Sequence, residues 1–323
     1  MSDVATTAGN AATLIGPGNR NDGSSGRNGV AGSTCSTYAE VTAVRATHPQ
    51  AIAEAWARRR RRATVSGDER LMIVAADHPA RGALSVGANP TAMNSRSDLL
   101  DRLRTALANP GVDGVLATSD ILEDLLLLGA LEDKVVFSSM NRGGLAGASF
   151  ELDDRMTAAT AKWTIDAGLN GAKMLNRVDL TDEGTLNMLT AAAAAIDELA
   201  AGGAIAMLEP FLSNRVDGKV RNDLTADAVI KSMHIVQGLG STSAYTWLKL
   251  PVVEEMERVM DATTLPTLLL GGDPQTAPDE TFASWERALQ IPSVRGLIVG
   301  RTLLYPADDD VATAVDTAVS LVR

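Results

Sequence analysis

From residue 71 onward the chain repeats one unit: a short apolar run, a polar or glycine-rich loop, and a stretch with helical spacing. Continuous apolar runs are typical of strands buried on both faces, and strands that alternate with helices form parallel sheets. The repeat therefore predicts an α/β protein built from βαβ units. Eight runs of this kind are present: Leu71–Ala76, Gly114–Thr118, Val135–Ser139, Ala172–Val178, Ile205–Phe211, Tyr245–Leu250, Thr267–Leu270 and Gly296–Val299.

Between the runs lie segments with helical spacing and good helix formers. Eight units with no strands left over favour a closed (β/α)8 TIM barrel. The alternative is an open doubly wound sheet, which usually has about five or six strands and a glycine-rich first turn. No GxGxxG follows the first run. The predicted helices include Ser97–Ala108, Asp153–Ala167, Thr181–Ala201, Asp227–Leu239, Val252–Ala262, Asp279–Leu289 and Asp310–Val322.

The segment before the first run differs from the rest. Gly16–Ser33 is rich in glycine, serine and asparagine and too polar to pack. We therefore expect residues 1–35 to form a flexible tail. Ser36–Arg62 contains one or two helices, one of them over Ala51–Ala63, that can plug the barrel floor. The prediction is one TIM barrel domain over residues 36–323 with an N-terminal helical extension.

The composition of the chain limits the kinds of partner that it can bind. The net charge of −11 argues against nucleic-acid binding, which needs concentrated Lys and Arg. The arginine run Arg58–Arg62 is the exception, and such runs usually form a solvated face. No apolar run reaches the roughly 20 residues that span a bilayer. Cys35 stands alone, which excludes an internal disulfide and fits a reducing compartment. We expect a cytoplasmic homo-oligomer that contacts neither membrane nor nucleic acid.

In a TIM barrel, functional residues lie at the carboxyl ends of the strands. Lysine within an apolar strand is the most informative residue there, because desolvation favours the neutral amine that imine formation requires. Strand alternation places Tyr245, Trp247 and Lys249 on one face, with Leu248 and Leu250 on the other. Lys249 is therefore predicted to point into the barrel as a nucleophile.

Two more charged residues lie on nearby strands. Lys173 is predicted to point inward, and Glu209, from the strand between the lysines, supplies a carboxylate for proton transfer. A strand lysine that is merely a core charge paired with Glu209 is the structural alternative. Two lysines and a carboxylate at the same end favour carbonyl chemistry.

Other strand ends offer contacts to a substrate. Gly271, Gly272, Gly300 and Arg301 end the last two strands, where barrels frequently bind phosphate. Arg301 can instead cap the barrel rim.

Asp77 can hold a substrate hydroxyl or pair with Arg81, and His78 either contacts substrate or stabilises its loop. Arg142 is a further candidate for binding substrate or phosphate.

Together these residues resemble the class I aldolase superfamily, which includes tagatose-bisphosphate, sulfofructose-phosphate, deoxyribose-phosphate and archaeal-type fructose-bisphosphate aldolases. The resemblance covers about residues 68–323. It implies that Lys249 forms the Schiff base, Glu209 is the acid/base, Asp77 belongs to the first motif and the last two strands bind phosphate. The motifs are Ala75-Ala76-Asp77-His78, Gly171-Ala172-Lys173-Met174-Leu175, Leu208-Glu209-Pro210, Trp247-Leu248-Lys249-Leu250-Pro251, Gly271-Gly272 and Val299-Gly300-Arg301.

The resemblance thus implies a lyase that cleaves or forms a C–C bond in a phosphorylated ketose or keto-sugar acid, without metal or cofactor. The chain is most similar to actinobacterial barrel proteins associated with inositol catabolism, which implies 2-deoxy-5-keto-gluconate 6-phosphate as substrate. Deoxyribose-phosphate, tagatose-bisphosphate or sulfofructose-phosphate activity is the first alternative. The others are a non-catalytic sugar-phosphate-binding barrel, a phosphosugar isomerase or epimerase, and a metal-dependent aldolase. The last needs converging ligands, yet the three histidines lie far apart in sequence.

Overall fold

The structure, a computed structural model, describes residues 34–64, 69–272 and 278–323. Within the chain, Thr34–Arg323 form one compact unit. All but the last two residues of the predicted tail, residues 1–35, lie outside the described part. No helix that the structure describes is long and apolar enough to cross a lipid bilayer.

Eight parallel strands in the described residues close into a barrel, which confirms the predicted α/β TIM barrel. Neighbours pair in the order β1-β2-β3-β4-β5-β7-β8-β9, and β9 pairs with β1 to close the ring. Every predicted apolar run coincides with one of these strands to within a few residues. Their bounds are β1 Leu71–Ala75, β2 Gly114–Ala117, β3 Val135–Ser139, β4 Gly171–Val178, β5 Ile205–Val216, β7 Thr246–Pro251, β8 Thr267–Leu270 and β9 Val294–Val299.

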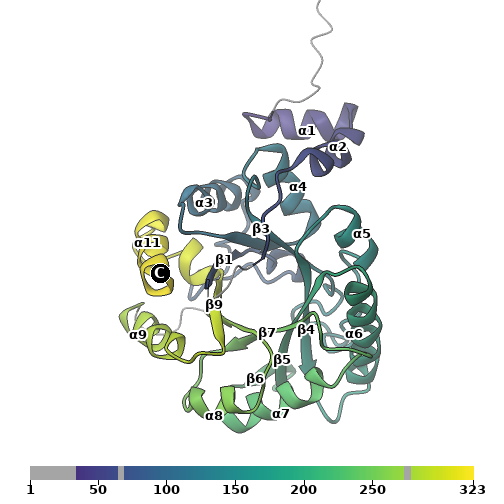
Figure 1. Cartoon of the computed structure of the whole chain (residues 1–323), viewed down its shortest axis with the longest axis vertical. Coiled ribbons are helices and arrows are strands. Elements are labelled where there is room, and N and C mark those ends of the chain that lie inside the picture. Colours follow the sequence, from purple (N-terminus) through teal and green to yellow (C-terminus); the bar gives the residue numbers. More distant parts are fainter. Residues whose placement is uncertain (1–33, 65–68, 273–277) are drawn as a thin grey trace, which may run out of the picture. The chain divides into compact units, whose positions relative to one another are not determined.

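Helices surround these strands (Figure 1). The described ones after β1 are α3 Arg96–Ala108, α4 Ser119–Leu127, α5 Ala161–Asp166, α6 Gly184–Ala201, α7 Ala226–Gln237, α8 Met256–Asp261, α9 Pro278–Leu289, α10 Arg301–Leu304 and α11 Val311–Val322. A 3-10 turn, Pro79–Arg81, follows β1.

Two predicted helices begin too early. The helix expected from Asp153 starts only at Ala161, because the Asp154 carboxylate accepts a hydrogen bond from the Gly144 amide and holds a loop instead. The helix expected from Val252 starts at Met256, after Glu255 with a left-handed φ of 58°. In the first place a side-chain hydrogen bond, and in the second a left-handed backbone conformation, prevents the helix from starting where the spacing of apolar residues predicts it.

The hairpin at the end of β5 was not predicted. β5 continues to Val216 and pairs antiparallel with β6 (Lys219–Asp223) through the two-residue turn Asp217-Gly218. Both turn residues have positive φ, 50° and 74°. An Asp-Gly turn of this kind matches the twist of paired strands. The dipeptide was a usable sequence signal.

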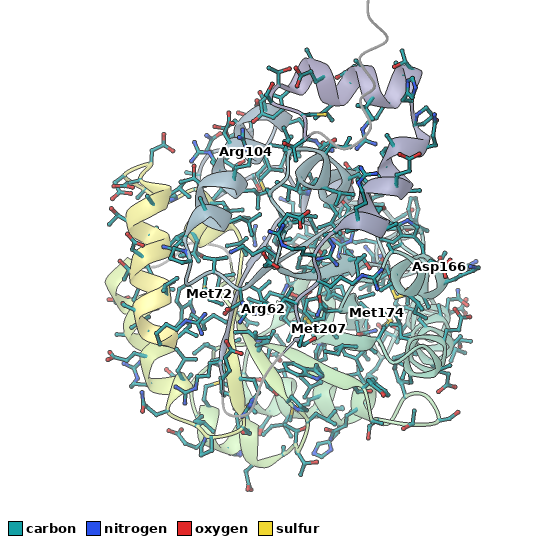
Figure 2. All side chains as sticks on the ribbon, turned by 45° about the horizontal axis from the view of Figure 1, so that its top comes forward. Arg62, Met72, Arg104, Asp166, Met174 and Met207 are labelled. Carbon is teal, nitrogen blue, oxygen red and sulfur yellow. The ribbon has the colours of Figure 1, made fainter. Side chains whose placement is uncertain are left out.

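Side chains alternate between the barrel interior and the helices. One buried cluster contains Ile73, Met207 and Trp247, while Met174 and Leu248 belong to the cluster that includes the helical residues. Figure 2 labels Met174 and Met207 among the side chains of the whole described chain. Strand positions two apart share a face. Lys249 therefore shares the interior face with Trp247, as the alternation predicts.

The N-terminal helices do not plug the floor. α1 (Tyr38–Thr47) and α2 (Gln50–Arg58) lie beside α3 and α4 (Figure 1). Arg45 pairs with Glu123 at 2.9 Å and Asp124 at 2.7 Å on α4. The apolar faces of α1 and α2 pack against the outer helices, because the floor of the barrel is polar and offers them less apolar surface.

The segment after α2 takes the floor position instead. Arg59 is 4% exposed and donates to the carbonyls of Lys134 at 3.1 Å and Gly168 at 2.9 Å. Arg62 pairs with Asp113 at 2.6 Å. The expected solvated face is therefore wrong for these two arginines, which bind groups at the starts of the strands.

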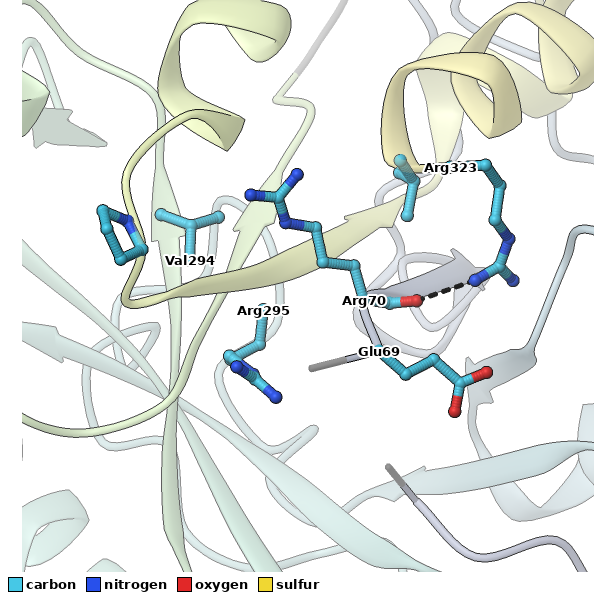
Figure 3. A pocket seen from close by; sticks show the side chains of 7 residues that line it. Glu69, Arg70, Val294, Arg295 and Arg323 are labelled. Atoms are coloured by element: carbon cyan, nitrogen blue, oxygen red, sulfur yellow. Dashed lines mark hydrogen bonds between the residues drawn. The ribbon is translucent and has the colours of Figure 1, made fainter. Parts of the chain in front are cut away.

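Arg323 completes the floor. It donates to the Arg70 carbonyl at 3.0 Å and pairs with Asp113 at 2.7 Å. Figure 3 shows the first contact within a surface pocket that Glu69, Arg70, Val294 and Arg323 line. This pocket lies at the starts of β1 and β9, so it faces away from the strand ends that carry the lysines.

Candidate active site

Charged side chains from four strands meet at the carboxyl ends of the barrel. Each continues an inward-facing series with a step of two: Asp77 after Ala75, Lys173 after Gly171, Glu209 after Met207, and Lys249 after Trp247. The alternation of side chains along each strand is therefore enough to point all four charged groups into the barrel interior. Their side chains are between 1% and 10% exposed.

The four side chains form one continuous series of ion pairs. Lys249 Nζ lies 2.9 Å from Glu209 Oε1. Lys173 Nζ lies 2.7 Å from Glu209 Oε2 and 2.8 Å from Asp77 Oδ2. Glu209 therefore bridges the two lysines, and Lys173 bridges the two carboxylates. The structure brings together all four residues that the sequence nominated for catalysis.

Asp77 has further partners from β3 and the loop after it. Arg142 Nη2 lies 2.8 Å from Asp77 Oδ2, and Arg142 Nη1 donates to the Asp77 carbonyl at 3.0 Å. Ser139 Oγ donates to the same Oδ2 at 3.0 Å. The alternative pairing of Asp77 with Arg81 is wrong, because Arg81 pairs with Asp154 at 3.0 Å.

The charges keep both carboxylates ionised. Burial raises the pKa of Glu209, but Lys173 and Lys249 outweigh it and hold that pKa at about 2. Burial likewise opposes ionisation of Asp77, yet Arg142 and Lys173 keep its pKa well below the usual value. For Lys173, burial lowers the pKa more than Asp77 and Glu209 raise it. Opposite charges within this cluster therefore stabilise the ionised carboxylates, while burial favours loss of a proton from Lys173.

His78 lies beside the cluster as a neutral imidazole. Burial lowers its pKa to about 3, against the attraction of Asp77 and with help from the positive charge of Arg301. Its Nδ1 lies 4.0 Å from Asp77 Oδ1, which is beyond hydrogen-bond distance. The ring is partly exposed, so it lies at the accessible end of the cluster.

The nominated phosphate residues occupy the ends of β8 and β9. Gly272 is exposed and has a φ of 70°. A Cβ at Gly300 would lie 2.4 Å from the Ala75 carbonyl oxygen, so only glycine lets these strands approach. Arg301 begins α10 and acts electrostatically on His78. Residues 273–277, which follow Gly272, lie outside the described part, and the phosphate site stays a prediction.

Sequence reasoning missed the polar groups that hold the loop after β3. Arg177 pairs with Glu151 at 2.5 Å, and Asn141 exchanges hydrogen bonds with both backbone groups of Leu175. Ser139 was also missed, although it stands two residues after the inward-facing Phe137. Strand alternation could have predicted the inward position of Ser139. No sequence pattern indicates the contacts of Arg177 and Asn141 with the loop after β3.

The buried polar cluster holds one more cation than it holds carboxylates. Its carboxylates, among the described residues, are Asp77, Glu151, Asp154 and Glu209, and its cations are Arg81, Arg142, Arg177, Lys173 and Lys249. An excess buried charge is unfavourable unless an amine is neutral or an anion binds. Within the described chain, no group of three or more His, Cys, Asp and Glu side chains is placed to hold a metal ion.

Residues 69–319 match the family described as Cgl0159-like. The crystal structure of Cgl0159 from Corynebacterium glutamicum (Brevibacterium flavum) is 58% identical, with a TM-score of 0.86 over 88% of this chain and 96% of that one.

Two more distant structures share the fold. A Schiff-base-forming fructose-1,6-bisphosphate aldolase is 17% identical, with a TM-score of 0.59 over 84% of this chain and 100% of that one. An archaeal fructose-1,6-bisphosphate aldolase, with its catalytic lysine bound to a carbinolamine intermediate, is 16% identical, with a TM-score of 0.60 over 84% of this chain and 99% of that one. No curated protein sequence matches this chain.

Proposed function

We propose that this chain, which belongs to the Cgl0159-like family, is a class I aldolase that cleaves or forms a C–C bond through a Schiff base on Lys249. The observation that carries the proposal is Glu209 lying between two buried lysines, 2.9 Å from Lys249 and 2.7 Å from Lys173, at the carboxyl ends of the strands. An amine nucleophile, a neighbouring ammonium and a carboxylate that transfers protons can together carry out imine chemistry on a ketone.

Lys249 is the better nucleophile of the two lysines by its contacts. The Lys173 amine forms ion pairs with two carboxylates, Asp77 and Glu209, whereas Lys249 has one carboxylate partner, Glu209, among the described residues. Lys173 then serves as the fixed cation that keeps both carboxylates charged.

The reaction proceeds in four steps. The free amine of Lys249 attacks the ketone carbon, and the carbinolamine loses water to give an iminium. Glu209, assisted by Lys173, accepts the proton of the hydroxyl on the far side of the scissile bond. The C–C bond then breaks, its electron pair moves into the iminium to form an enamine, and an aldehyde leaves. Glu209 returns the proton to the enamine carbon, and water hydrolyses the resulting iminium to free the ketone and Lys249.

The substrate that we propose is a phosphorylated ketose or keto-sugar acid. Gly271, Gly272, Gly300 and Arg301 at the ends of β8 and β9 would hold the phosphate, as last strands of such barrels often do. The two aldolases with the same fold act on fructose 1,6-bisphosphate. The sequence resemblance adds 2-deoxy-5-keto-gluconate 6-phosphate, and hence inositol catabolism, as the specific candidate.

A sugar-phosphate-binding barrel without catalysis is the second candidate. The same ion pairs favour it, because lysines satisfied by Asp77 and Glu209 would also form in a purely structural cluster. The two candidates differ in one respect: only the aldolase forms a covalent bond with a ketone.

Borohydride trapping distinguishes them. The protein is incubated with dihydroxyacetone phosphate or fructose 1,6-bisphosphate, reduced, and weighed by intact mass spectrometry. We expect a stable adduct on the Lys249 peptide of the wild type and none in Lys249→Met. The matched control is Lys162→Met, since Lys162 is 82% exposed and its ion-pair partner is Asp166 on the same helix. An adduct that survives in Lys249→Met would place the nucleophile elsewhere, and its absence in the wild type would favour the binding barrel.

A further inference from the structure

The two oxygens of the Asp77 carboxylate have unequal surroundings. Oδ2 accepts a hydrogen bond from Ser139 Oγ at 3.0 Å and forms ion pairs with Lys173 Nζ and Arg142 Nη2, each at 2.8 Å. Oδ1 accepts no hydrogen bond from any residue that the structure describes, and Nδ1 of the neutral His78 imidazole lies 4.0 Å from it. An ionised carboxylate offers about four lone-pair sites, two on each oxygen. Oδ1 is therefore the oxygen left to accept a bond from a ligand.

Arg142 is committed to Asp77 through both terminal nitrogens. Nη1 donates to the Asp77 carbonyl at 3.0 Å, while Nη2 pairs with Oδ2 at 2.8 Å, and the side chain is 6% exposed. The guanidinium therefore fixes the backbone and the carboxylate of the same residue. A planar fork holds two acceptors at a set angle, which an ammonium cannot do.

The position of Arg142 is itself fixed by its neighbours in the loop. Its amide donates to Thr157 Oγ1 at 3.1 Å. Asn141, the preceding residue, donates to the Leu175 carbonyl at 2.5 Å and accepts from the Leu175 amide at 2.8 Å. These hydrogen bonds join the loop after β3 to β4, the strand that carries Lys173. Arg142 and Lys173 therefore contact Asp77 from two segments that are held together.

We infer that Arg142, with Ser139, is a positioning residue that turns the Asp77 carboxylate so that Oδ1 faces the ligand and accepts a hydroxyl next to the reacting carbonyl. This role replaces the direct contact with substrate that the sequence suggested for Arg142. The inference rests on the proposed function, because it assigns Asp77 a hydroxyl of the ketone bound at Lys249.

Fixing that hydroxyl has a chemical consequence. An iminium loses a proton from the neighbouring carbon only when the C–H bond stands perpendicular to the C=N plane. A hydroxyl on that carbon, held by Oδ1, sets the rotation about the intervening C–C bond and selects one of its two hydrogens. If Arg142 is lost, the carboxylate can turn, and the selected C–H bond leaves the reactive angle. A misplacement of about 1 Å can reduce a rate by roughly 100-fold.

The probe is dihydroxyacetone phosphate in D2O, with exchange at its hydroxymethyl carbon followed by NMR and adduct formation by borohydride trapping. The variants are Arg142→Gln, Arg142→Lys and Ser139→Ala. The matched control is Arg59→Gln, because Arg59 is similarly buried, at 4% exposed, but donates to the carbonyls of Lys134 and Gly168 at the opposite end of the barrel. Circular dichroism and thermal unfolding of each variant monitor the fold.

The wild type should form the adduct and exchange one of the two hydrogens. Arg142→Gln should form the adduct, exchange about 100-fold more slowly and lose selectivity between the hydrogens. Arg142→Lys should not restore the selectivity, because lysine cannot make both contacts. Ser139→Ala should lose less, since it removes one neutral hydrogen bond to Oδ2, whereas Arg142 carries a charge and also holds the Asp77 carbonyl. Because Arg142 lowers the pKa of Asp77, the pH below which exchange slows should rise in Arg142→Gln and stay in place in Arg59→Gln.

Two failures are distinguishable. A wild type that forms no adduct contradicts the proposed function, and this inference with it. A wild type that forms the adduct, together with an Arg142→Gln protein that exchanges one hydrogen at the wild-type rate and pH dependence, contradicts this inference alone. If Arg142→Gln fails to fold, wild-type rate and selectivity in both Arg142→Lys and Ser139→Ala would contradict it.

Discussion

Lys173 and Glu209 lie diagonally across neighbouring strands, with Lys173 Nζ 2.7 Å from Glu209 Oε2. Their strands β4 and β5 pair in register, and Lys173 is directly beside Met207, two residues before Glu209. The lysine therefore reaches diagonally toward the open end of the barrel. Both side chains are almost fully buried, so neither can satisfy its charge with water.

Lys173→Met should separate imine formation from cleavage. The substitution removes the cation shared by Asp77 and Glu209 and leaves Lys249 with its partner. We expect the borohydride adduct at Lys249 to persist and C–C bond cleavage to fall by roughly 100-fold or more, the range typical of positioned acid–base groups. Loss of the adduct in a folded Lys173→Met protein would show that Lys173 is needed for imine formation itself.

The stability of the protein should fall as the pH drops through two windows. The pKa of His78 is lowered from 6.5 to about 3 by folding, so its contribution is present above 6.5 and is lost as the pH falls from 6.5 toward 3. The pKa of Glu209 is lowered from 4.5 to about 2, so its contribution is lost between 4.5 and 2. Urea unfolding over a pH series that crosses both windows measures the two losses.

His78→Asn provides the control for the upper window, because asparagine does not titrate there. Its free energy of unfolding should depend less on pH between 6.5 and 4.5 than that of the wild type. Equal slopes for the two proteins would mean that folding leaves the His78 pKa near its ordinary value.

Asp113→Ala should destabilise the fold without changing the chemistry. Asp113 is 1% exposed, pairs with Arg62 and Arg323, and accepts from the Met72 amide at 2.6 Å. Because both arginines are partly exposed and can rehydrate, we expect a loss of about 2–3 kcal/mol in the free energy of unfolding. Borohydride trapping well below the midpoint of thermal unfolding should be unchanged. Loss of the adduct would show that the ion pairs of Asp113 at the floor affect the reactivity of the lysines at the other end of the barrel.

Chelation should leave the activity intact. The proposed mechanism uses the Lys249 iminium as electron sink, so no Lewis acid is required. Trapping with dihydroxyacetone phosphate after dialysis against EDTA should match that of the untreated protein within about twofold. A large loss that Zn²⁺ restores would favour the metal-dependent alternative.

Much of this site could be predicted because strand alternation is a short-range rule. Once Trp247 was assigned inward, Lys249 followed, and the same step of two applies to Glu209 after Met207. The contacts of Arg142 and Arg81 could not be predicted, because both arginines lie in loops whose partners are set by tertiary structure. The helix that was expected to start at Asp153 failed for the same reason, since Asp154 serves the loop rather than a helix.

Closure of the barrel has a consequence for how activity is acquired during folding. A fragment ending after β4 would contain Asp77 and Lys173 but neither Glu209 nor Lys249, and a shift of one residue in any of these strands would turn its charged group toward the helices. No half of the barrel therefore holds a working set of groups. Turnover should appear only when the ring of strands is complete. Enzymatic activity therefore indicates that the strands of an active molecule have paired in the correct register.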